Sequence, residues 1–440
     1  MSLKRALKFN RLIAVTMGTP LASSVFPSIM LLDLTASSLI NEIIAILLAT
    51  ALVIMSSLAY SELVSIYPTA AGNRVFLRKP LGDTIALGLS LMWIFILLGA
   101  AGVEGYVVGY VLYYLISLYV NGVILKILSP LILSLMVMTL ILIINILGVE
   151  LSGNFQMGIT YFIAASLIAI SIISFFISRD MSIQNYSLGS LSLVKALSAA
   201  AVGVYFFLGF GRVTTLGEEA LDYKRDLPMA IPIGVSLLGL VFIFISTAIL
   251  VHVPIKSLIS MLIPQILLGR YLLGRDGAIF MIIVSVLMSF STFNAGVLGT
   301  SRLIYALGRE GTLPRFLSRI HRKYFTPYAA LLFLYAVAVL MLFLITYTRS
   351  FSIPLYVAAG FDSFMYAFIG YSALWHIRHE HGNIPFRIKG GFIIYLVVVV
   401  MFMILGILLL LTTPPIVAII IVLGTLVLIL YARYIIKRSR

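Results

Sequence analysis

The segment from Tyr205 to Glu219, YFFLGFGRVTTLGEE, starts as an apolar helix and is interrupted at the depth where a helix would cross the centre of a bilayer. Gly209 and Gly211 break the apolar run, and Arg212 places a charge inside it. Hydrocarbon cannot hydrogen-bond the backbone groups that such a break frees, so protein or a water-filled cavity must satisfy them. The segment therefore predicts a polar site within the membrane.

Composition identifies the class of protein. Of the 440 residues, 62% are hydrophobic and 10% are charged, whereas a soluble domain has roughly a quarter of its residues charged. The absence of cysteine excludes disulfides, thiolate metal sites and thiol nucleophiles. The net charge of +15 comes from basic residues in short loops between apolar segments, which is a membrane topology signal rather than a nucleic-acid groove. We expect a multi-pass protein of the lipid bilayer that binds neither metal nor nucleic acid.

Apolar stretches bounded by charges, Pro or Gly predict about twelve transmembrane helices. Their expected limits are 11–32, 39–66, 84–118, 123–146, 155–178, 194–218, 229–252, 277–307, 327–346, 353–375, 391–412 and 414–436. The segment 255–275 is expected to be a loop with a short surface helix. Most of the Lys and Arg residues fall in alternate loops, on the side of the N-terminus, which predicts that both termini are cytoplasmic. Short loops are typical of a protein of a prokaryotic cell (cytoplasmic) membrane.

A second breakable span lies near the N-terminus. The first span contains Gly18-Thr-Pro-Leu-Ala-Ser-Ser-Val-Phe-Pro27. It precedes the broken sixth span by five spans, so the two run in opposite directions across the membrane. This placement is typical of secondary transporters with an inverted repeat. It predicts repeats at 1–180 and 181–380, each of five spans, followed by two C-terminal helices at 381–440.

Several stretches resemble motifs of the amino acid–polyamine–organocation (APC) transporter superfamily. They are the run from Tyr205 to Ile231 with its Glu218-Glu219 pair, Ala59-Tyr-Ser-Glu62 followed by Tyr67-Pro68, Asn294-Ala-Gly through Pro314, and Pro385-Phe-Arg387. They occur in order and at the right spans. The resemblance implies an all-α, LeuT-like fold with a 5+5 inverted repeat. It also implies a permease or exchanger of amino acids or related amines, which is not an enzyme and needs no cofactor.

The first span is expected to bind the carboxylate of the substrate. Its second half-helix starts near Ala22, Ser23 and Ser24, where free N–H groups and the positive end of the helix dipole suit an anion. Related proteins bind the α-carboxylate of the substrate at this place with Gly-Ser-Gly, so Ala22 and Ser24 depart from the pattern and Ser23 matches it. A competing interpretation is that Pro20 only kinks a packing helix.

The sixth span is expected to bind the ammonium of the substrate. Carbonyls freed at Phe207, Leu208 and Gly209 would accept its hydrogens, and Tyr205, Phe206 and Phe207 would form an aromatic lid. These aromatic residues can equally be ordinary packing. Related proteins carry an acid after Gly-Phe, where this chain has Gly211 followed by Arg212.

Carboxylates inside spans are functional hypotheses because their burial is costly. Glu104 in the third span and Asp362 in the tenth can each pair with Arg212, bind a cationic substrate group, or carry a coupling proton. An ion pair with Arg212 that only fixes helix packing is the structural alternative.

The coupling ion is left open between H⁺ and Na⁺. Some proton-coupled relatives place a lysine in the fifth span, and Ile163 is expected to stand at that position here. Sodium would use carbonyls of the first span with Ser289, Ser291 and Thr292, and exchange without an ion is equally open.

The sequence also bears on three alternative functions. An intramembrane enzyme would need a catalytic motif that the sequence lacks. A sensor on a transporter scaffold, and a permease for a polyamine or another non-amino-acid organic cation, stay open as alternatives. The sequence carries no signal for an oligomeric state.

Overall fold

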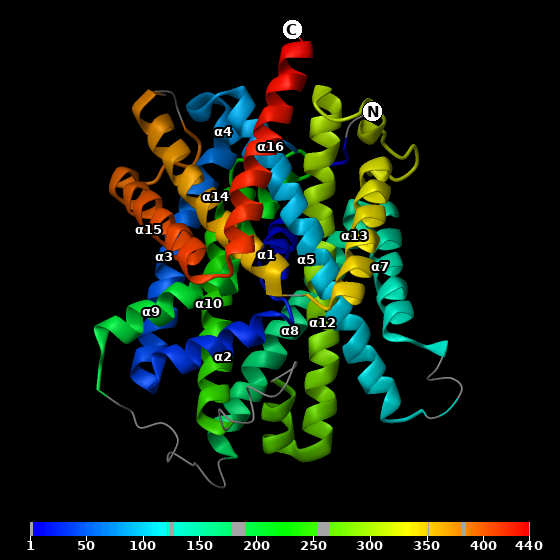
Figure 1. Cartoon of the computed structure of the whole chain (residues 1–440), viewed down its shortest axis with the longest axis vertical. Helices are drawn as coiled ribbons and strands as arrows, with labels where there is room; N and C mark the ends of the chain where they lie inside the picture. Colours follow the sequence, from blue (N-terminus) through cyan, green and yellow to red (C-terminus); the bar gives the residue numbers. More distant parts are fainter. Residues whose placement is uncertain are drawn as a thin grey trace.

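The structure is a computed structural model that describes residues 3–120, 122, 127–177, 190–253, 265–350, 352–379 and 384–439. Throughout this part of the chain the regular secondary structure is helical, and the helices form an elongated bundle (Figure 1). The α-helices are α1 (Phe9–Gly18), α2 (Val25–Ala36), α3 (Leu39–Ile66), α4 (Asn73–Leu81), α5 (Asp83–Ser117), α7 (Pro130–Ile146), α8 (Val149–Phe176), α9 (Leu193–Gly203), α10 (Asp226–His252), α12 (Gln265–Glu310), α13 (Tyr328–Thr348), α14 (Ser352–His379), α15 (Gly391–Thr412) and α16 (Pro415–Ser439). Short 3-10 helices are η2 (Val204–Phe207), η3 (Phe210–Leu216) and η4 (Arg315–Ser318).

Length and hydropathy confirm a membrane protein. Among the described residues, ten helices are long and apolar enough to cross a bilayer. The first predicted span is instead divided into α1 and α2, and the fourth is the shorter apolar helix α7. Local signals set several helix starts: Ser38 accepts a hydrogen bond from the backbone of Asn41 at the start of α3, and Ser129 precedes Pro130 at the start of α7. The predicted all-α fold is therefore confirmed.

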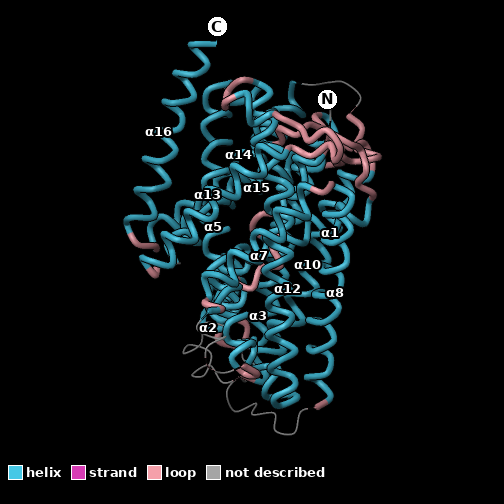
Figure 2. Tube along the Cα trace, turned by 90° about the vertical axis from the view of Figure 1, so that its right-hand side faces the viewer, coloured by secondary structure: helices cyan, strands magenta, loops and turns pink. Residues whose placement is uncertain are grey.

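The two termini lie at the same end of the molecule, which we call the terminal end (Figure 1). An even number of crossings requires this arrangement. Most connecting loops gather at that end as well (Figure 2).

The largest shift from a predicted boundary is at the start of the eighth span. The helix α12 begins at Gln265, well before the expected start at 277, and contains a reversal at Leu273 and Gly274, where Gly274 has φ +63°. The backbone at Gly269 packs so closely against Gly277 that a methyl group there would collide with its carbonyl. The short helix before the reversal therefore folds back on α12, and the rest of the predicted surface segment, 255–264, lies outside the described residues.

Ion pairs tie the terminal end together. Arg302 of α12 donates two hydrogen bonds to Glu219, at 2.7 and 2.9 Å, and both side chains are fully buried. Next to it, Arg309 pairs with Glu218, where the arginine is 48% exposed. Burial opposes ionisation of Glu218, but the hydrogen bonds from Arg309 and from the amide of Ala70 outweigh it and lower the pKa of its carboxyl. The Glu-Glu pair of the sequence thus joins the end of the sixth span to the eighth.

The adjacent pairs allow a matched stability test. Replacing Glu219 by Gln leaves the buried guanidinium of Arg302 without a carboxylate partner. We therefore expect the free energy of unfolding to fall by about 3–5 kcal/mol. Glu218→Gln breaks the exposed pair and is expected to cost less than about 1 kcal/mol. Thermal unfolding of both variants in detergent measures the difference, and equal losses would contradict this account.

Candidate functional site

A cavity of about 380 Å³ lies where the two broken spans meet α5, α12 and α14. Its walls are mainly apolar, and its charged groups come from α5, η3 and α14. The predicted site residues that line it are Pro20, Ala22, Ser23, Ser24, Glu104, Tyr205, Phe206, Leu208, Arg212 and Asp362. Those that do not line it are Phe207, Gly209, Gly211 and Ser291.

The break in the first span lies where the sequence predicts it. The helix α1 ends at Gly18, residues 19–24 are non-helical, and α2 starts at Val25. Hydroxyls of α12 satisfy the carbonyls at the end of α1: Ser291 and Thr292 both donate to Gly18, at 3.3 Å. The N-terminus of α2 therefore opens onto the cavity while the end of α1 is held by α12.

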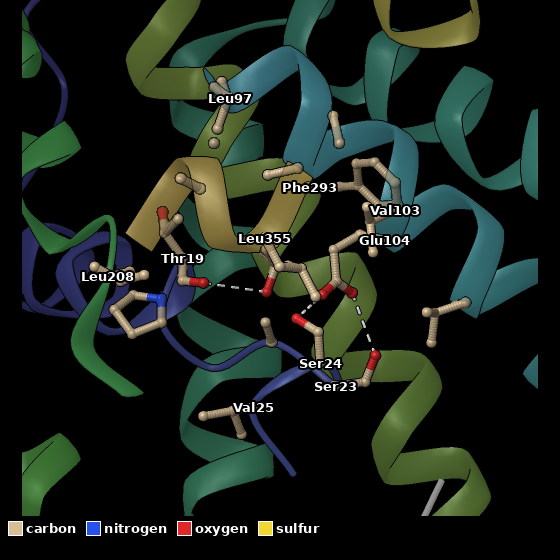
Figure 3. A pocket seen from close by; sticks show the side chains of 18 of the residues that line it. Thr19, Ser23, Ser24, Val25, Leu97, Val103, Glu104, Leu208, Phe293 and Leu355 are labelled. Atoms are coloured by element: carbon tan, nitrogen blue, oxygen red, sulfur yellow. Dashed lines mark hydrogen bonds between the residues drawn. The ribbon is translucent and has the colours of Figure 1, made fainter. Parts of the chain in front are cut away.

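The side chain of Glu104, which belongs to α5, lies against the N-terminus of α2. Ser23 donates to its carboxyl group at 3.2 Å and Ser24 donates to the other oxygen (Figure 3). Ser289 of α12 also donates to it, at 3.2 Å. The backbone amide of Ser24 faces the same carboxylate. The side chain is 3% exposed. A carboxyl group of the protein itself thus lies at the place predicted for the substrate carboxylate, and Glu104 is not paired with Arg212.

The break in the sixth span is centred on Leu208 and Gly209. Leu208 has ψ 133° and Gly209 has φ +94°, so the chain turns between η2 and η3. The Gly209 amide donates to the hydroxyl of Tyr366 at 3.2 Å, and its carbonyl accepts from the amide of Arg212 at 3.1 Å. That carbonyl therefore already accepts one hydrogen bond within η3, and its contact with an ammonium stays a prediction.

The aromatic residues of the sixth span divide into two groups. Tyr205 and Phe206 line the cavity. The ring of Phe207 is fully buried and packs edge-on against Phe242, with 5.3 Å between the ring centroids, so its predicted place in the lid is wrong. Gly211 also lies outside the cavity, and its lack of a side chain admits the ring of Tyr60.

The side chain of Trp93 contacts both Arg212 and Asp362. The guanidinium of Arg212 lies 5.3 Å from the centroid of the indole ring, and the indole N–H donates to Asp362 at 3.0 Å. Both charged side chains are buried, at 4% and 1% exposed. Arg212 forms no ion pair with a described residue, and its Nε has no hydrogen-bond partner. A guanidinium with unused donors therefore faces the cavity.

Gln156 of α8 is a residue that the sequence analysis missed. Its amide donates to Ser291 at 2.7 Å and to Thr160 at 2.8 Å, beside the Gly18 carbonyl that Ser291 also contacts. Ile163, which was expected at this position of the fifth span, is buried among apolar residues instead. The oxygens predicted to bind sodium are thus partly engaged by a neutral amide donor. The signal in the sequence is an amide side chain inside the predicted span 155–178, whose other polar residues are hydroxyls.

Comparison with known proteins identifies the family. The family model described as "Amino acid permease" matches residues 7–436. The chain belongs to the amino acid permease family. The predicted resemblance to APC transporters is thereby confirmed, and the family consists of transporters rather than enzymes.

Individual relatives are more distant. The chain is 25% identical over 209 residues to the cystine/glutamate transporter of Homo sapiens, covering 47% of this chain and 42% of that protein. It is 34% identical over 163 residues to the Asc-type amino acid transporter 1 of Mus musculus, covering 37% and 30% of the two chains. It is 33% identical over 159 residues to the large neutral amino acids transporter small subunit 2 of Oryctolagus cuniculus, covering 36% and 29%. The matched part therefore spans less than half the length of these relatives.

The fold is also found in a solved structure. The crystal structure of MhsT in complex with L-phenylalanine superposes with a TM-score of 0.64 at 15% identity, covering 93% of this chain and 99% of that chain. At this identity the likeness shows the fold alone. The predicted LeuT-like fold is confirmed.

The break at Gly209 gives a test of the site geometry. A methyl group at Gly209 would collide with the side chains of Arg212 and Thr19, and a positive φ is strained for alanine. We expect Gly209→Ala to destabilise the protein by about 1–3 kcal/mol. Gly158→Ala, on the exposed face of α8 with open space around it, is the matched control and should be neutral or stabilising. Melting temperatures compare the two, and an unaffected Gly209→Ala would refute the proposed need for a left-handed residue.

Proposed function

We propose that this protein is a secondary transporter that carries amino acids across the cell membrane by alternating access, with both termini in the cytoplasm. The observation that carries the proposal is the cavity at two broken spans, with a helix N-terminus and buried charges in its wall. The relatives named above are amino acid transporters, which supports an amino acid over a polyamine and a transporter over a sensor. We assign 1–180 and 181–380 to the two repeats and 381–440 to the additional helices.

The polar groups of the cavity suggest how an amino acid would bind. Its carboxylate would take the N-terminus of α2, where Ser23, Ser24 and their backbone amides provide donors. Its ammonium would use the carbonyl of Leu208, at the break between η2 and η3. Apolar groups and the rings of Tyr205 and Phe206 would cover the side chain. A substrate about the size of a free amino acid fits a cavity of this volume.

Glu104 is the proposed coupling group. Its carboxylate uses the same donors that the carboxylate of an amino acid would need. Two carboxylates cannot share one set of donors as anions, because they repel each other at low dielectric. A proton on Glu104 would remove the repulsion and release the donors. Binding of the substrate would thus be linked to binding of a proton.

Sodium is not the proposed coupling ion. The hydroxyls of Ser291 and Thr292 are engaged with the carbonyl of Gly18, and Gln156 directs an amide donor at the same place. A sodium ion binds oxygen lone pairs and is repelled by donor hydrogens. The geometry therefore favours a proton over sodium.

Uptake of labelled amino acids into proteoliposomes tests the function. We expect accumulation driven by an inward proton gradient, which Glu104→Gln abolishes because the neutral amide cannot exchange a proton. Exchange of labelled for unlabelled substrate, which needs no net proton movement, should persist in this variant. Glu150→Gln, at a half-exposed carboxylate outside the cavity, is the control and should retain both activities.

Two results would contradict the proposal. Absence of both uptake and exchange for every amino acid by the wild type would reject the amino acid assignment. Gradient-driven accumulation by Glu104→Gln equal to that of the wild type would leave the function standing and reject Glu104 as the coupling group.

The proposal that sodium is not the coupling ion has its own test. Replacing sodium by choline at constant ionic strength should leave uptake and the melting temperature of the wild type unchanged, since no sodium site is occupied. A sodium-dependent rise in melting temperature that Ser291→Ala removes would show that sodium binds at the end of α1.

A further inference from the structure

A second pair of carboxylates lies buried outside the cavity described above. Asp33 of α2 and Glu42 of α3 are both fully buried, and neither lines the cavity. The hydroxyl of Ser246 on α10 lies between them, 2.6 Å from one oxygen of Glu42 and 3.4 Å from one oxygen of Asp33. The other oxygen of each carboxyl group is buried without a hydrogen-bond partner. Three helices that adjoin one another (Figure 1) thus converge on an under-satisfied acidic pair.

No cation in the described chain neutralises this pair. The helices and 3-10 segments that pack on α2 and α3 carry other titratable groups, and none of them hydrogen-bonds or ion-pairs with Asp33 or Glu42. These groups are Tyr60 and Glu62 on α3, Lys195 on α9, Tyr205 on η2, Arg212 on η3, Asp226 and His252 on α10, Tyr356, Asp362, Tyr366, Tyr371, His376, Arg378 and His379 on α14, and Tyr395 on α15. Two uncompensated anions so close together inside a membrane protein would repel each other strongly.

The geometry around Ser246 accommodates one proton. A hydroxyl has a single hydrogen, so Ser246 can donate to Glu42 or to Asp33 but not to both. The second contact becomes a hydrogen bond only if the other carboxyl is protonated and donates to the hydroxyl oxygen. We propose that Asp33, Glu42 and Ser246 form a proton-binding site, separate from Glu104, that holds α2 against α3 and α10.

The position of Asp33 on α2 links this site to the cavity. Ser28 and Leu31 of the same helix line the cavity. Each residue of a helix turns by about 100°, which places Asp33 about 140° from Ser28 and about 160° from Leu31 around the axis. One face of α2 is thus a wall of the cavity, and the opposite face carries the acidic pair. Loss of the proton would make the two carboxylates repel each other and push α2 towards the cavity.

The chain has no cysteine, so a single introduced thiol reports on this movement. We would introduce Ser28→Cys, a near-isosteric change in the cavity wall, and measure its rate of modification by a maleimide in detergent between about pH 5 and about pH 9. The rate is divided by that of Tyr347→Cys, a 90% exposed position, to remove the ionisation of the thiol itself. The measurement uses the whole protein without substrate, so it does not depend on the proposed transport.

We expect the normalised rate to fall about fivefold or more as the pH rises, because α2 moves into the cavity and shields the thiol. Asp33→Asn and Glu42→Gln should each hold the rate near its low-pH value throughout, since the neutral side chain removes the repulsion. Glu104→Gln should retain the pH dependence. Ser246→Ala keeps both carboxyl groups and should also retain the pH dependence. It is the control for a loss of pH dependence that is caused only by misfolding of a variant at this place.

Three results of the pH series would overturn the proposal, and a fourth comes from sodium. They are a flat normalised rate in the Ser28→Cys parent, a pH dependence that survives both neutral variants, and a dependence that Glu104→Gln removes. The same change produced by sodium at constant pH would assign the acidic pair to a metal cation and equally overturn the proton site.

Discussion

The need to satisfy every backbone hydrogen-bonding group inside the membrane underlies the whole arrangement. Ordinary spans do so within their own helices, and the first and sixth spans cannot. Each break is therefore completed by side chains of other helices. Hydroxyls of α12 bind the carbonyls at the end of α1, and the hydroxyl of Tyr366 accepts the amide of Gly209. The broken spans are stable only when they pack against α5, α12 and α14, and the site lies where these elements meet.

The same constraint explains why the two ends of the molecule differ. At the terminal end the sixth span continues into Glu219, which is locked to Arg302 by a fully buried pair. The chain before α1 joins the same point, because the amides of Ala6 and Leu7 both donate to the carbonyl of Glu219. On the other side of the breaks, one face of α2 forms a wall of the cavity. Its opposite face carries Asp33, which is paired with Glu42, and one oxygen of each carboxyl group has no hydrogen-bond partner. Strong contacts thus hold the terminal end, and groups that respond to a proton hold α2.

The fold could be predicted from the sequence because its signals are local. Runs of apolar residues mark the spans, and glycines and prolines mark the breaks near Gly18 and Gly209. Glu104, Arg212 and Asp362 were recognisable as site candidates because charge inside a span is rare. Their partners were not recognisable, since the contact of Glu104 with Ser23 and Ser24 depends on how helices far apart in the sequence are rotated against each other. For the same reason Phe207 could not be told from Phe206, although they are neighbours, and Gln156 was overlooked.

Glu104 raises the question of why a transporter would fill its own anion site. An empty helix N-terminus facing an apolar cavity would leave amides and hydroxyls without partners, which is costly at low dielectric. Glu104 supplies those partners in the absence of substrate. The free energy of substrate binding at these donors is therefore only the difference between the interaction of the substrate carboxylate and the interaction of Glu104 with the same groups. This difference is small when Glu104 is an anion and large when it carries a proton. In the proposed mechanism, an internal ligand of this kind would keep the empty site intact and would make its affinity depend on protonation, with no need for a separate mechanism that senses the ion.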